Sequence, residues 1–372
     1  MKTLLIKASG ITSPSWRGYN SGVGRSTQKL LSALNDIDQI PFDIKVYVNG
    51  FGSLNFDFFN WKFKRIKFPV PSRIGNDLTK LEPYWRTHFV KYDLLHIPHN
   101  IDVVYPKENY VVTLHDVIAY DNACKNGDTL TSERWERMAH RARAIMTCSE
   151  YSKSEIVHKL GVPPERVHVV YWGTSDDVFY VNDESETKNK LEALGISSPY
   201  FVSISCAHPR KNIRMLLKAY REFNKSNPEH ILVLVWGGFP DDLKKEYSHE
   251  ISSGKVVILD YVTDADLRAL YNGASCTMFP TLAEGFGFPI LESFACNTPV
   301  MTCRNTCLPE IGQDTAIYVG EQAIDEMVDV MRMFENCSYD HSCFEEGAKR
   351  IIHQFSWKNT ALSYIDFYKK YI

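Results

Sequence analysis

The second half of the chain alternates short apolar runs with stretches of helical periodicity. The apolar runs have the length and composition of buried β-strands, and they fall at 200–204, 231–236, 255–259, 275–279, 300–303 and 316–319. A repeated order of strand and helix brings successive strands into one sheet in the same direction. The pattern therefore predicts an α/β fold with a parallel, doubly wound sheet.

The first half of the chain has a similar but less regular pattern. Strand-like runs fall at 1–7, 44–48, 66–68, 94–98 and 110–114. A chain of 372 residues exceeds the size that one hydrophobic core usually supports, so two domains are expected. The acidic stretch 176–198 lacks apolar periodicity and is predicted to link an N-terminal domain, 1–175, to a C-terminal domain, 199–355.

The composition is that of an ordinary soluble globular enzyme, with 44% hydrophobic and 23% charged residues. Because 42 basic residues face 45 acidic ones, the chain has no strong electric field, and nucleic acid is not favoured as a partner. The first apolar run, 1–7, is too short for a signal peptide or a membrane span. The expected location is the cytoplasm, or the cytosolic face of a membrane.

The nine cysteines are scattered, and several lie inside apolar runs. No Cys-x-x-Cys pair occurs, so buried free thiols in a reducing compartment are favoured over a zinc site. Two Asp-x-Asp sequences, 36–38 and 264–266, resemble a metal-binding pattern, but both are typical of acids at helix ends. No metal site is predicted.

The segment 284–292, EGFGFPILE, joins two carboxylates to a glycine turn and a helix start. It follows the apolar run 275–279, so its order is strand, glycine loop, helix. In a parallel sheet this order places the loop at the carboxyl edge, where ligands bind, beside a helix N-terminus that attracts phosphate. Carboxylates also accept hydrogen bonds from sugar hydroxyls. The alternative is a plain tight turn with a solvated Glu284 and a helix-start carboxylate at Glu292.

This segment, continuing to Val300, resembles the paired-glutamate motif of the retaining glycosyltransferases of family 4, which have the GT-B fold. The resemblance implies two Rossmann-like domains whose sheets face each other across a cleft, with a carboxyl-terminal helix, 356–372, returning to the first domain. It also implies that Glu284 contacts the transferred sugar and that Glu292 binds the nucleotide ribose. Donor-binding residues implied by the same motif are Gly285, Phe286, Gly287 and Phe288. Asn297 stands where the family usually has glycine, a mild departure because asparagine tolerates a left-handed backbone.

The loop 205–212 follows the apolar run 200–204 and contains adjacent cations, Arg210 and Lys211. Asn212 is predicted to cap the next helix, which would place both cations beside a helix N-terminus. Isolated Arg-Lys pairs are usually solvated surface cations. Pro-Arg-Lys-Asn after a strand nevertheless resembles the phosphate-binding loop of the family, which implies that Arg210 and Lys211 bind the donor diphosphate, although Ser205 replaces a common glycine.

Two further sites are predicted in the N-terminal domain. His115 ends the run 110–114, and Val-Thr-Leu-His-Asp-Val resembles the His-Asp motif of the family, in which the histidine contacts the transferred sugar. Without that resemblance, a histidine that caps its own loop would be the better interpretation. Gly22 and Gly24 resemble the amino-terminal glycine loop that approaches donor phosphates and acceptor, whereas a plain turn is the alternative. The basic, aromatic segment 61–68 is compatible with peripheral membrane contact, but an edge strand protected by lysines is favoured.

Together these features predict retaining, metal-independent hexosyl transfer from a nucleotide-diphosphate sugar to a glycan or lipid-linked acceptor. The nucleotide sugar is a co-substrate, and no other cofactor is expected. GDP-mannose and UDP-hexoses are both compatible, with a slight preference for GDP-mannose from likeness to mannosyl-transferring members. A nucleotide-sugar epimerase or hydrolase and a catalytically silent binding subunit remain as alternatives. The sequence does not define an oligomeric state.

Overall fold

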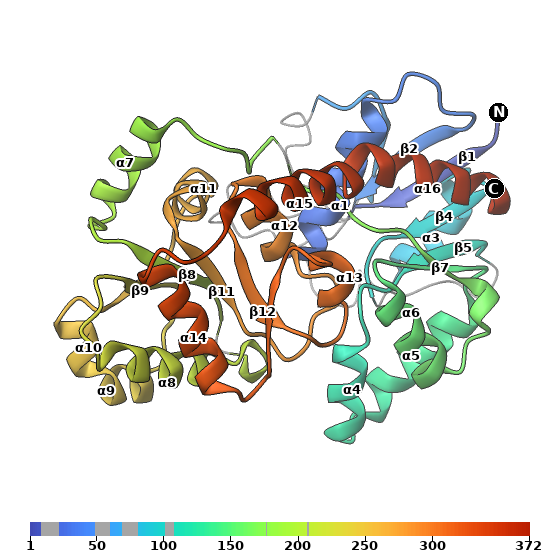
Figure 1. The fold of residues 1–372 in the computed structure, drawn as a ribbon. Helices are drawn as coiled ribbons and strands as arrows, with labels where there is room; N and C mark the ends of the chain where they lie inside the picture. Colours follow the sequence, from blue (N-terminus) through green and yellow to red (C-terminus); the bar gives the residue numbers. More distant parts are fainter. Residues whose placement is uncertain (9–21, 49–59, 69–80, 101–107, 176, 207) are drawn as a thin grey trace. The chain divides into compact units, whose positions relative to one another are not determined.

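The computed structural model of the protein consists of two units. Unit 1 comprises Met1–Gly173 and Trp357–Ile372, and unit 2 comprises Thr174–Ser356 (Figure 1). The residues that the structure describes are 1–8, 22–48, 60–68, 81–100, 108–175, 177–206 and 208–372. Within this part of the chain, no helix is both long and apolar enough to cross a bilayer.

Unit 1 is built on a seven-stranded sheet whose paired strands are all parallel. The strand order is β3-β2-β1-β4-β5-β6-β7. The strands are β1 (Thr3–Lys7), β2 (Asp43–Val48), β3 (Lys64–Lys67), β4 (Leu94–Ile97), β5 (Tyr110–Thr113), β6 (Ile145–Thr147) and β7 (Val167–Val169). The exposed lysines at both ends of β3 lie on the sheet edge, where charge discourages pairing with another chain. This placement agrees with the edge-strand interpretation of 61–68.

The helices of unit 1 come from both parts of its chain. They are α1 (Gly22–Asn35), α3 (Glu82–Phe89), α4 (Ile118–Lys125), α5 (Thr129–Arg141), α6 (Glu150–Leu160) and α16 (Trp357–Tyr371), with a 3₁₀ turn at Pro164–Arg166. Helix α1 buries Leu30, Leu31 and Leu34 on one side, and it packs against α16. The carboxyl-terminal helix is therefore part of the core of unit 1.

A buried polar chain fastens α16 to the sheet of unit 1. The hydroxyl of Tyr368 lies 2.7 Å from Nδ1 of His96 on β4, and Nε2 of His96 lies 2.9 Å from Oγ1 of Thr113 on β5. The hydroxyl of Tyr364 is 3.3 Å from the same threonine oxygen. Each of these buried side chains thus has a hydrogen-bond partner although no solvent is near. Such fully paired networks favour a single packing arrangement of α16 on the sheet.

We expect this network to weaken in acid. Burial, followed by the charges of His99 and His115, lowers the pKa of His96 to about 3, so the unfolded chain binds the proton first as the pH falls below about 6.5. The contribution is present above pH 6.5 and is lost toward pH 3, at about 1.4 kcal/mol of unfolding free energy per pH unit. Urea titrations between pH 4 and pH 6.5 should therefore show a slope shallower by about this amount in His96→Asn. An unchanged slope in His96→Asn would contradict the assignment.

Unit 2 is built on a six-stranded parallel sheet with the order β10-β9-β8-β11-β12-β13. The strands are β8 (Tyr200–Ile204), β9 (Ile231–Val235), β10 (Val256–Leu259), β11 (Cys276–Phe279), β12 (Val300–Cys303) and β13 (Ile317–Val319). Each corresponds to an apolar run predicted from the sequence. The parallel α/β prediction is confirmed for this unit. Its strands could be recognised in the sequence because buried strands of a parallel sheet are apolar along their whole length.

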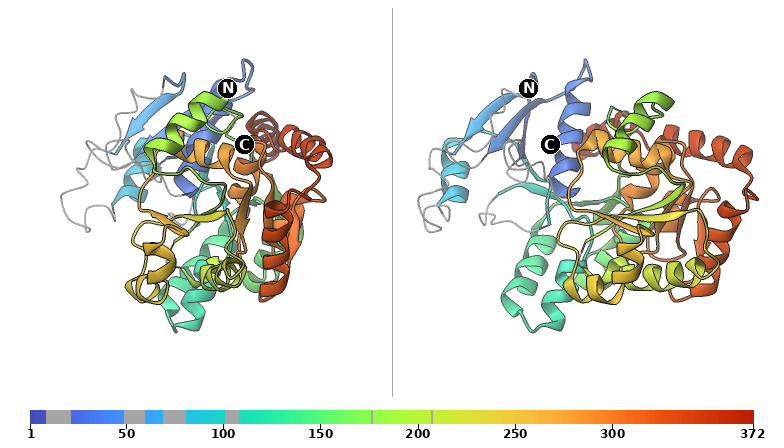
Figure 2. Two further views of the ribbon diagram at one scale, coloured as in Figure 1. Left: turned by 60° about the vertical axis from the view of Figure 1, so that its left-hand side comes forward. Right: turned by 90° about the vertical axis from the view of Figure 1, so that its left-hand side faces the viewer.

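Helices cover both faces of the unit 2 sheet (Figure 2). They are α7 (Glu184–Ala193), α8 (Ile213–Asn224), α9 (Asp241–Glu246), α10 (Ser248–Ser252), α11 (Asp264–Gly273), α12 (Phe288–Ala295), α13 (Leu308–Gly312), α14 (Ile324–Glu335) and α15 (His341–Gln354), with a 3₁₀ turn at Pro209–Lys211. Alternate residues of β8 serve the two cores, because Phe201 packs with α8 and α14 whereas Tyr200 and Val202 pack toward α11. The carboxyl ends of β8 and β11 are adjacent, which positions the loops described below.

The segment predicted as a linker, 176–198, is not an irregular passage, because it contains α7. This helix has few apolar residues, but Leu191 packs against the core beside α11, and two charge pairs add to that contact. Glu186 accepts from Arg268 at 3.1 Å, and Lys190 donates to Asp266 at 3.0 Å. Polar composition alone therefore misled the prediction. The chain passes between the units at 173–174 and again at 356–357.

Candidate active site

The predicted phosphate loop follows β8 and leads into α8. Arg210 and Lys211 lie in the 3₁₀ turn directly before that helix, as the sequence suggested. The predicted cap is wrong, because Asn212 makes no side-chain cap. Its backbone is left-handed, with φ of 57°, whereas capping side chains need an extended backbone. The Asn212 amide instead donates to the carbonyl of Glu321 at 2.8 Å, which ties the loop to the segment after β13.

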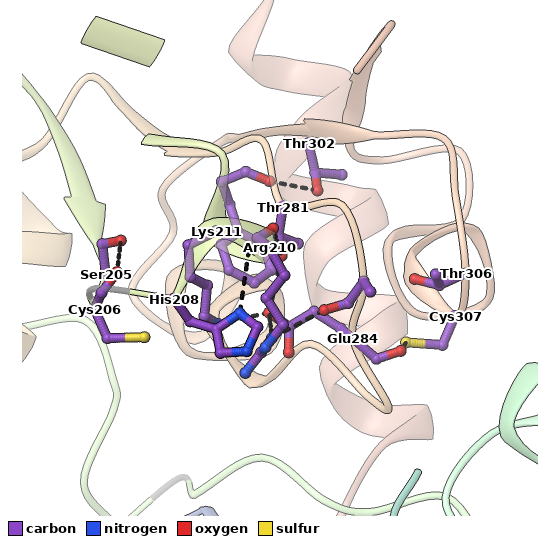
Figure 3. Close-up of polar contacts among 12 residues, drawn as sticks. Ser205, Cys206, His208, Arg210, Lys211, Thr281, Glu284, Thr302, Thr306 and Cys307 are labelled. Atoms are coloured by element: carbon purple, nitrogen blue, oxygen red, sulfur yellow. Dashed lines mark hydrogen bonds and ion pairs between the residues drawn. The ribbon is translucent and has the colours of Figure 1, made fainter. Parts of the chain in front are cut away.

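Both cations of this loop contact the carboxylate of Glu284 (Figure 3). Glu284 follows β11, the neighbour of β8 in the sheet. Its Oε1 lies 2.5 Å from Nζ of Lys211 and 2.7 Å from Nη1 of Arg210. The hydroxyl of Thr281 lies 3.0 Å from the same oxygen and 3.1 Å from the carbonyl of Arg210. The structure therefore brings Glu284 to the adjacent Arg210 and Lys211, although 73 positions separate Glu284 from Lys211 in the chain.

The cluster has more positive than negative charge and is partly withdrawn from solvent. The side chains are 27% exposed for Arg210, 15% for Lys211 and 13% for Glu284. At this depth charges interact more strongly than on an open surface. Arg210 also donates to the carbonyl of Ala283 at 2.9 Å, and the ammonium of Lys211 lies 5.2 Å from the ring centre of Phe279. Two fixed cations against one carboxylate suit an added anion such as a diphosphate.

The glycine turn after Glu284 opens α12. Gly287 is the residue before the helix and has φ of 94°, which only glycine adopts without strain. A Cβ at this position would lie 3.0 Å from Cδ2 of Leu308. Phe286 is buried, with its ring packed edge-on against Phe288 and Phe355, so only its backbone can meet a ligand. The backbone of Gly285–Gly287 leads into the N-terminus of α12, where the motif predicts contact with a phosphate or sugar, and that contact stays a prediction.

Glu292 lies in the second turn of α12. Its Oε2 accepts a hydrogen bond of 3.0 Å from the hydroxyl of Tyr271, which belongs to α11. The predicted left-handed backbone at Asn297 is confirmed, with φ of 58°. Asparagine thus fulfils the role of the more common glycine after this helix.

His115 belongs to unit 1 and lies two residues after the end of β5. Its Nε2 lies 3.0 Å from the carbonyl of Pro98, so this nitrogen carries the proton, and the ring centre lies 4.8 Å from that of Trp172. Burial lowers the pKa of His115 to about 4, which keeps the ring neutral at neutral pH. Among the described residues Nδ1 has no partner. His115 can therefore act as a neutral hydrogen-bond acceptor, while Asp116 braces the loop by accepting from the backbone of Ile118 at 2.9 Å.

Gly22 and Gly24 are not part of a loop before a helix, because both lie in the first turn of α1. The preceding residues, 9–21, fall outside the described part of the chain. Further along the first turns of α1, the hydroxyls of Ser26 and Thr27 donate to the carbonyl of Val23, each at 2.9 Å. Their role toward donor or acceptor remains a prediction.

Sequence reasoning missed three residues around the two glutamates. Thr281 and Tyr271 contact Glu284 and Glu292 as described above, and the thiol of Cys307 donates to the carbonyl of Glu284 at 3.2 Å. Burial, followed by the charge of Glu284, raises the pKa of Cys307, so it remains a thiol donor. All nine cysteines are free thiols, but the prediction that they are buried holds for only five, because Cys124, Cys206, Cys337 and Cys343 are exposed. No local signal marks these three contacts, because each depends on how separate elements meet.

Comparison with known proteins agrees with this geometry. The sequence model described as "Glycosyl transferases group 1" matches residues 185–350, and the model described as "Glycosyltransferase Family 4" matches residues 21–178. O-antigen chain mannosyltransferase B of Escherichia coli is 28% identical over 284 residues, which cover 74% of this chain and 72% of that protein. The serotype-specific mannosyltransferase WbdA of the same species is 28% identical over 239 residues, but this chain spans only 28% of its length.

The fold is shared with solved glycosyltransferase structures. The structure of Alr3699/HepE from Anabaena in complex with UDP and glucose superposes with a TM-score of 0.73, at 16% sequence identity, over the whole of both chains. The predicted GT-B class is confirmed by this likeness and by the two parallel sheets.

Proposed function

The chain belongs to the group 1 glycosyltransferases, and from this membership we propose that it moves a hexose from a nucleotide-diphosphate sugar to a glycan or lipid-linked acceptor. The observation that carries the proposal is the cluster of Arg210, Lys211 and Glu284 beside the N-terminus of α12. Cations and helix N–H groups recognise a diphosphate, and a carboxylate recognises sugar hydroxyls. One site therefore presents groups for both halves of the donor.

The proposed reaction proceeds with retention of the anomeric configuration. The acceptor oxygen bonds to the anomeric carbon on the face from which the diphosphate oxygen departs, and a phosphate oxygen takes the acceptor proton. Arg210 and Lys211 neutralise the charge that grows on the leaving diphosphate, which is electrostatic stabilisation by groups already in place. Glu284 and His115 orient the sugar by hydrogen bonds, and neither acts as a covalent nucleophile.

Two cations in the site provide the charge that a divalent metal supplies elsewhere, so we propose a metal-independent reaction. The relatives named as mannosyltransferases support a mannose donor, with GDP-mannose slightly preferred. The HepE complex keeps UDP-hexoses as the alternative donor class. The acceptor is proposed to be a growing glycan, as the name of the O-antigen enzyme suggests.

Thermal unfolding with and without nucleotides tests the donor site. We expect either UDP or GDP, without added metal, to raise the midpoint by several degrees, since a ligand at a hundred times its Kd adds about 2.7 kcal/mol. The Arg210→Ala variant should reduce this shift by about half or more, because its Kd is expected to be about tenfold to a hundredfold higher. If neither nucleotide, nor ADP nor dTDP, shifts the midpoint, the donor assignment is wrong.

Product analysis then separates the proposed transfer from its rivals. With the matching nucleotide sugar and an acceptor, we expect an α- or β-linkage that keeps the donor configuration, at a rate unaffected by EDTA. Free sugar or an epimerised nucleotide sugar without acceptor would indicate a hydrolase or epimerase. Nucleotide binding without any turnover would instead indicate a silent binding subunit.

A further inference from the structure

The hydrogen bond between Tyr271 and Glu292 joins two helices that flank the donor site. Tyr271 is fully buried in α11, and its hydroxyl lies 3.0 Å from Oε2 of the glutamate on α12. A hydroxyl that donates to a carboxylate makes a charge-assisted bond, which is stronger than a bond between neutral groups. Burial of the ring leaves that hydroxyl little freedom to turn elsewhere.

Tyr271 and the helix that bears Glu292 are each fixed by other contacts. The backbone carbonyl of Tyr271 accepts from the hydroxyl of Thr298 at 2.6 Å, and its ring packs edge-on against Phe179. On α12, the hydroxyl of Ser293 lies 2.7 Å from that of Thr277 on β11. Because both ends of the hydrogen bond rest on packed elements, it selects one orientation of the Glu292 carboxylate.

We propose that Tyr271 is a positioning residue for recognition of the nucleotide ribose, acting through Glu292. The inference rests on the proposed function, in which Glu292 accepts from the ribose hydroxyls. A carboxylate has about four acceptor positions, so a tyrosine bond at Oε2 leaves capacity for a vicinal diol. A carboxylate fixed in this way discriminates strongly between a ribose and a deoxyribose, because the missing hydroxyl leaves it poorly paired.

The test removes only the hydroxyl. In Tyr271→Phe we expect the preference for UDP over 2′-deoxy-UDP, or for GDP over 2′-deoxy-GDP, to fall about tenfold, the effect of one hydrogen bond to a charged group. Calorimetric titration measures both affinities. The KM for the nucleotide sugar should rise by a similar factor, while kcat remains within about twofold of the wild type since Tyr271 does not contact the reacting atoms.

Tyr200→Phe is the matched control. Tyr200 is also buried in unit 2, and its hydroxyl donates to the carbonyl of Leu270 on the same helix at 2.8 Å. This variant should lose comparable thermal stability but keep the ribose preference. In a Glu292→Gln background, Tyr271→Phe should change the preference little further, because two residues that act through one contact are not additive.

The outcomes separate the inference from its premise. If the wild type prefers the ribonucleotide and Tyr271→Phe keeps the full preference, the inference is wrong and the proposed function stands. If the wild type binds nucleotides without any ribose preference, the role assigned to Glu292 is wrong, and the inference is overturned with it. Absence of nucleotide binding overturns the proposed function itself, and the inference with it.

Discussion

Replacing Glu284 by glutamine is expected to lower kcat for transfer at least about a hundredfold, the scale of removing one preorganised polar group from an active site. The amide keeps the shape of the side chain but loses the charge. In the wild type, Oε1 of Glu284 contacts Lys211, Arg210 and Thr281. The glutamine variant therefore also removes the negative charge that pairs with the two cations. Affinity for the free nucleoside diphosphate should therefore rise while transfer falls.

Initial-rate assays with the matching nucleotide sugar measure kcat for transfer. Calorimetric titration with the nucleoside diphosphate measures its affinity. The control is Glu321→Gln, because Glu321 is an exposed carboxylate of the same unit whose Oε1 accepts from Asn305 at 2.7 Å. This control should change neither quantity. Wild-type turnover in Glu284→Gln, with the thermal midpoint preserved, would contradict the site assignment.

Replacing Arg210 by alanine is expected to raise the KM for the nucleotide sugar about tenfold to a hundredfold, the range for losing a charge-assisted hydrogen bond. Arg214→Ala is a close control. Arg214 lies one helical turn further along in α8, its side chain is 60% exposed, and it pairs with Asp242 on the surface. Removing that guanidinium should leave KM unchanged, and equal effects of both substitutions would show that Arg210 acts only through the overall field.

The strands of unit 2 could be predicted from the sequence, whereas several elements of unit 1 could not. Each strand of a buried parallel sheet is one apolar run, and Pro or Gly residues mark its ends. The predictions missed β6 and β7, which have three residues each. Helix α7 was missed because its sequence is mostly polar and only Leu191 and Leu194, at its carboxyl end, pack against the core.

The residues of the candidate site could be predicted from the sequence, but the contacts between them could not. Loops after parallel strands lie at one edge of the sheet, so Arg210, Lys211 and Glu284 were expected near each other. That Glu284 holds both cations depends on β8 and β11 being neighbours, although two strands separate them in the sequence. The failed cap at Asn212 has a similar cause, since its amide bonds to the distant Glu321 carbonyl.

Because unit 1 contains α16, its fold cannot be complete until residues 357–372 have been synthesised. Unit 2 is one continuous stretch, 174–356, and all of it leaves the ribosome before the final helix does. During that interval His96 and Thr113 lack the tyrosines of α16 that later cover them. Unit 2 can therefore be completed before unit 1, whereas an N-terminal domain usually folds first during synthesis. A premature stop codon shortly before Trp357 would release a protein whose second unit is complete and whose first is not.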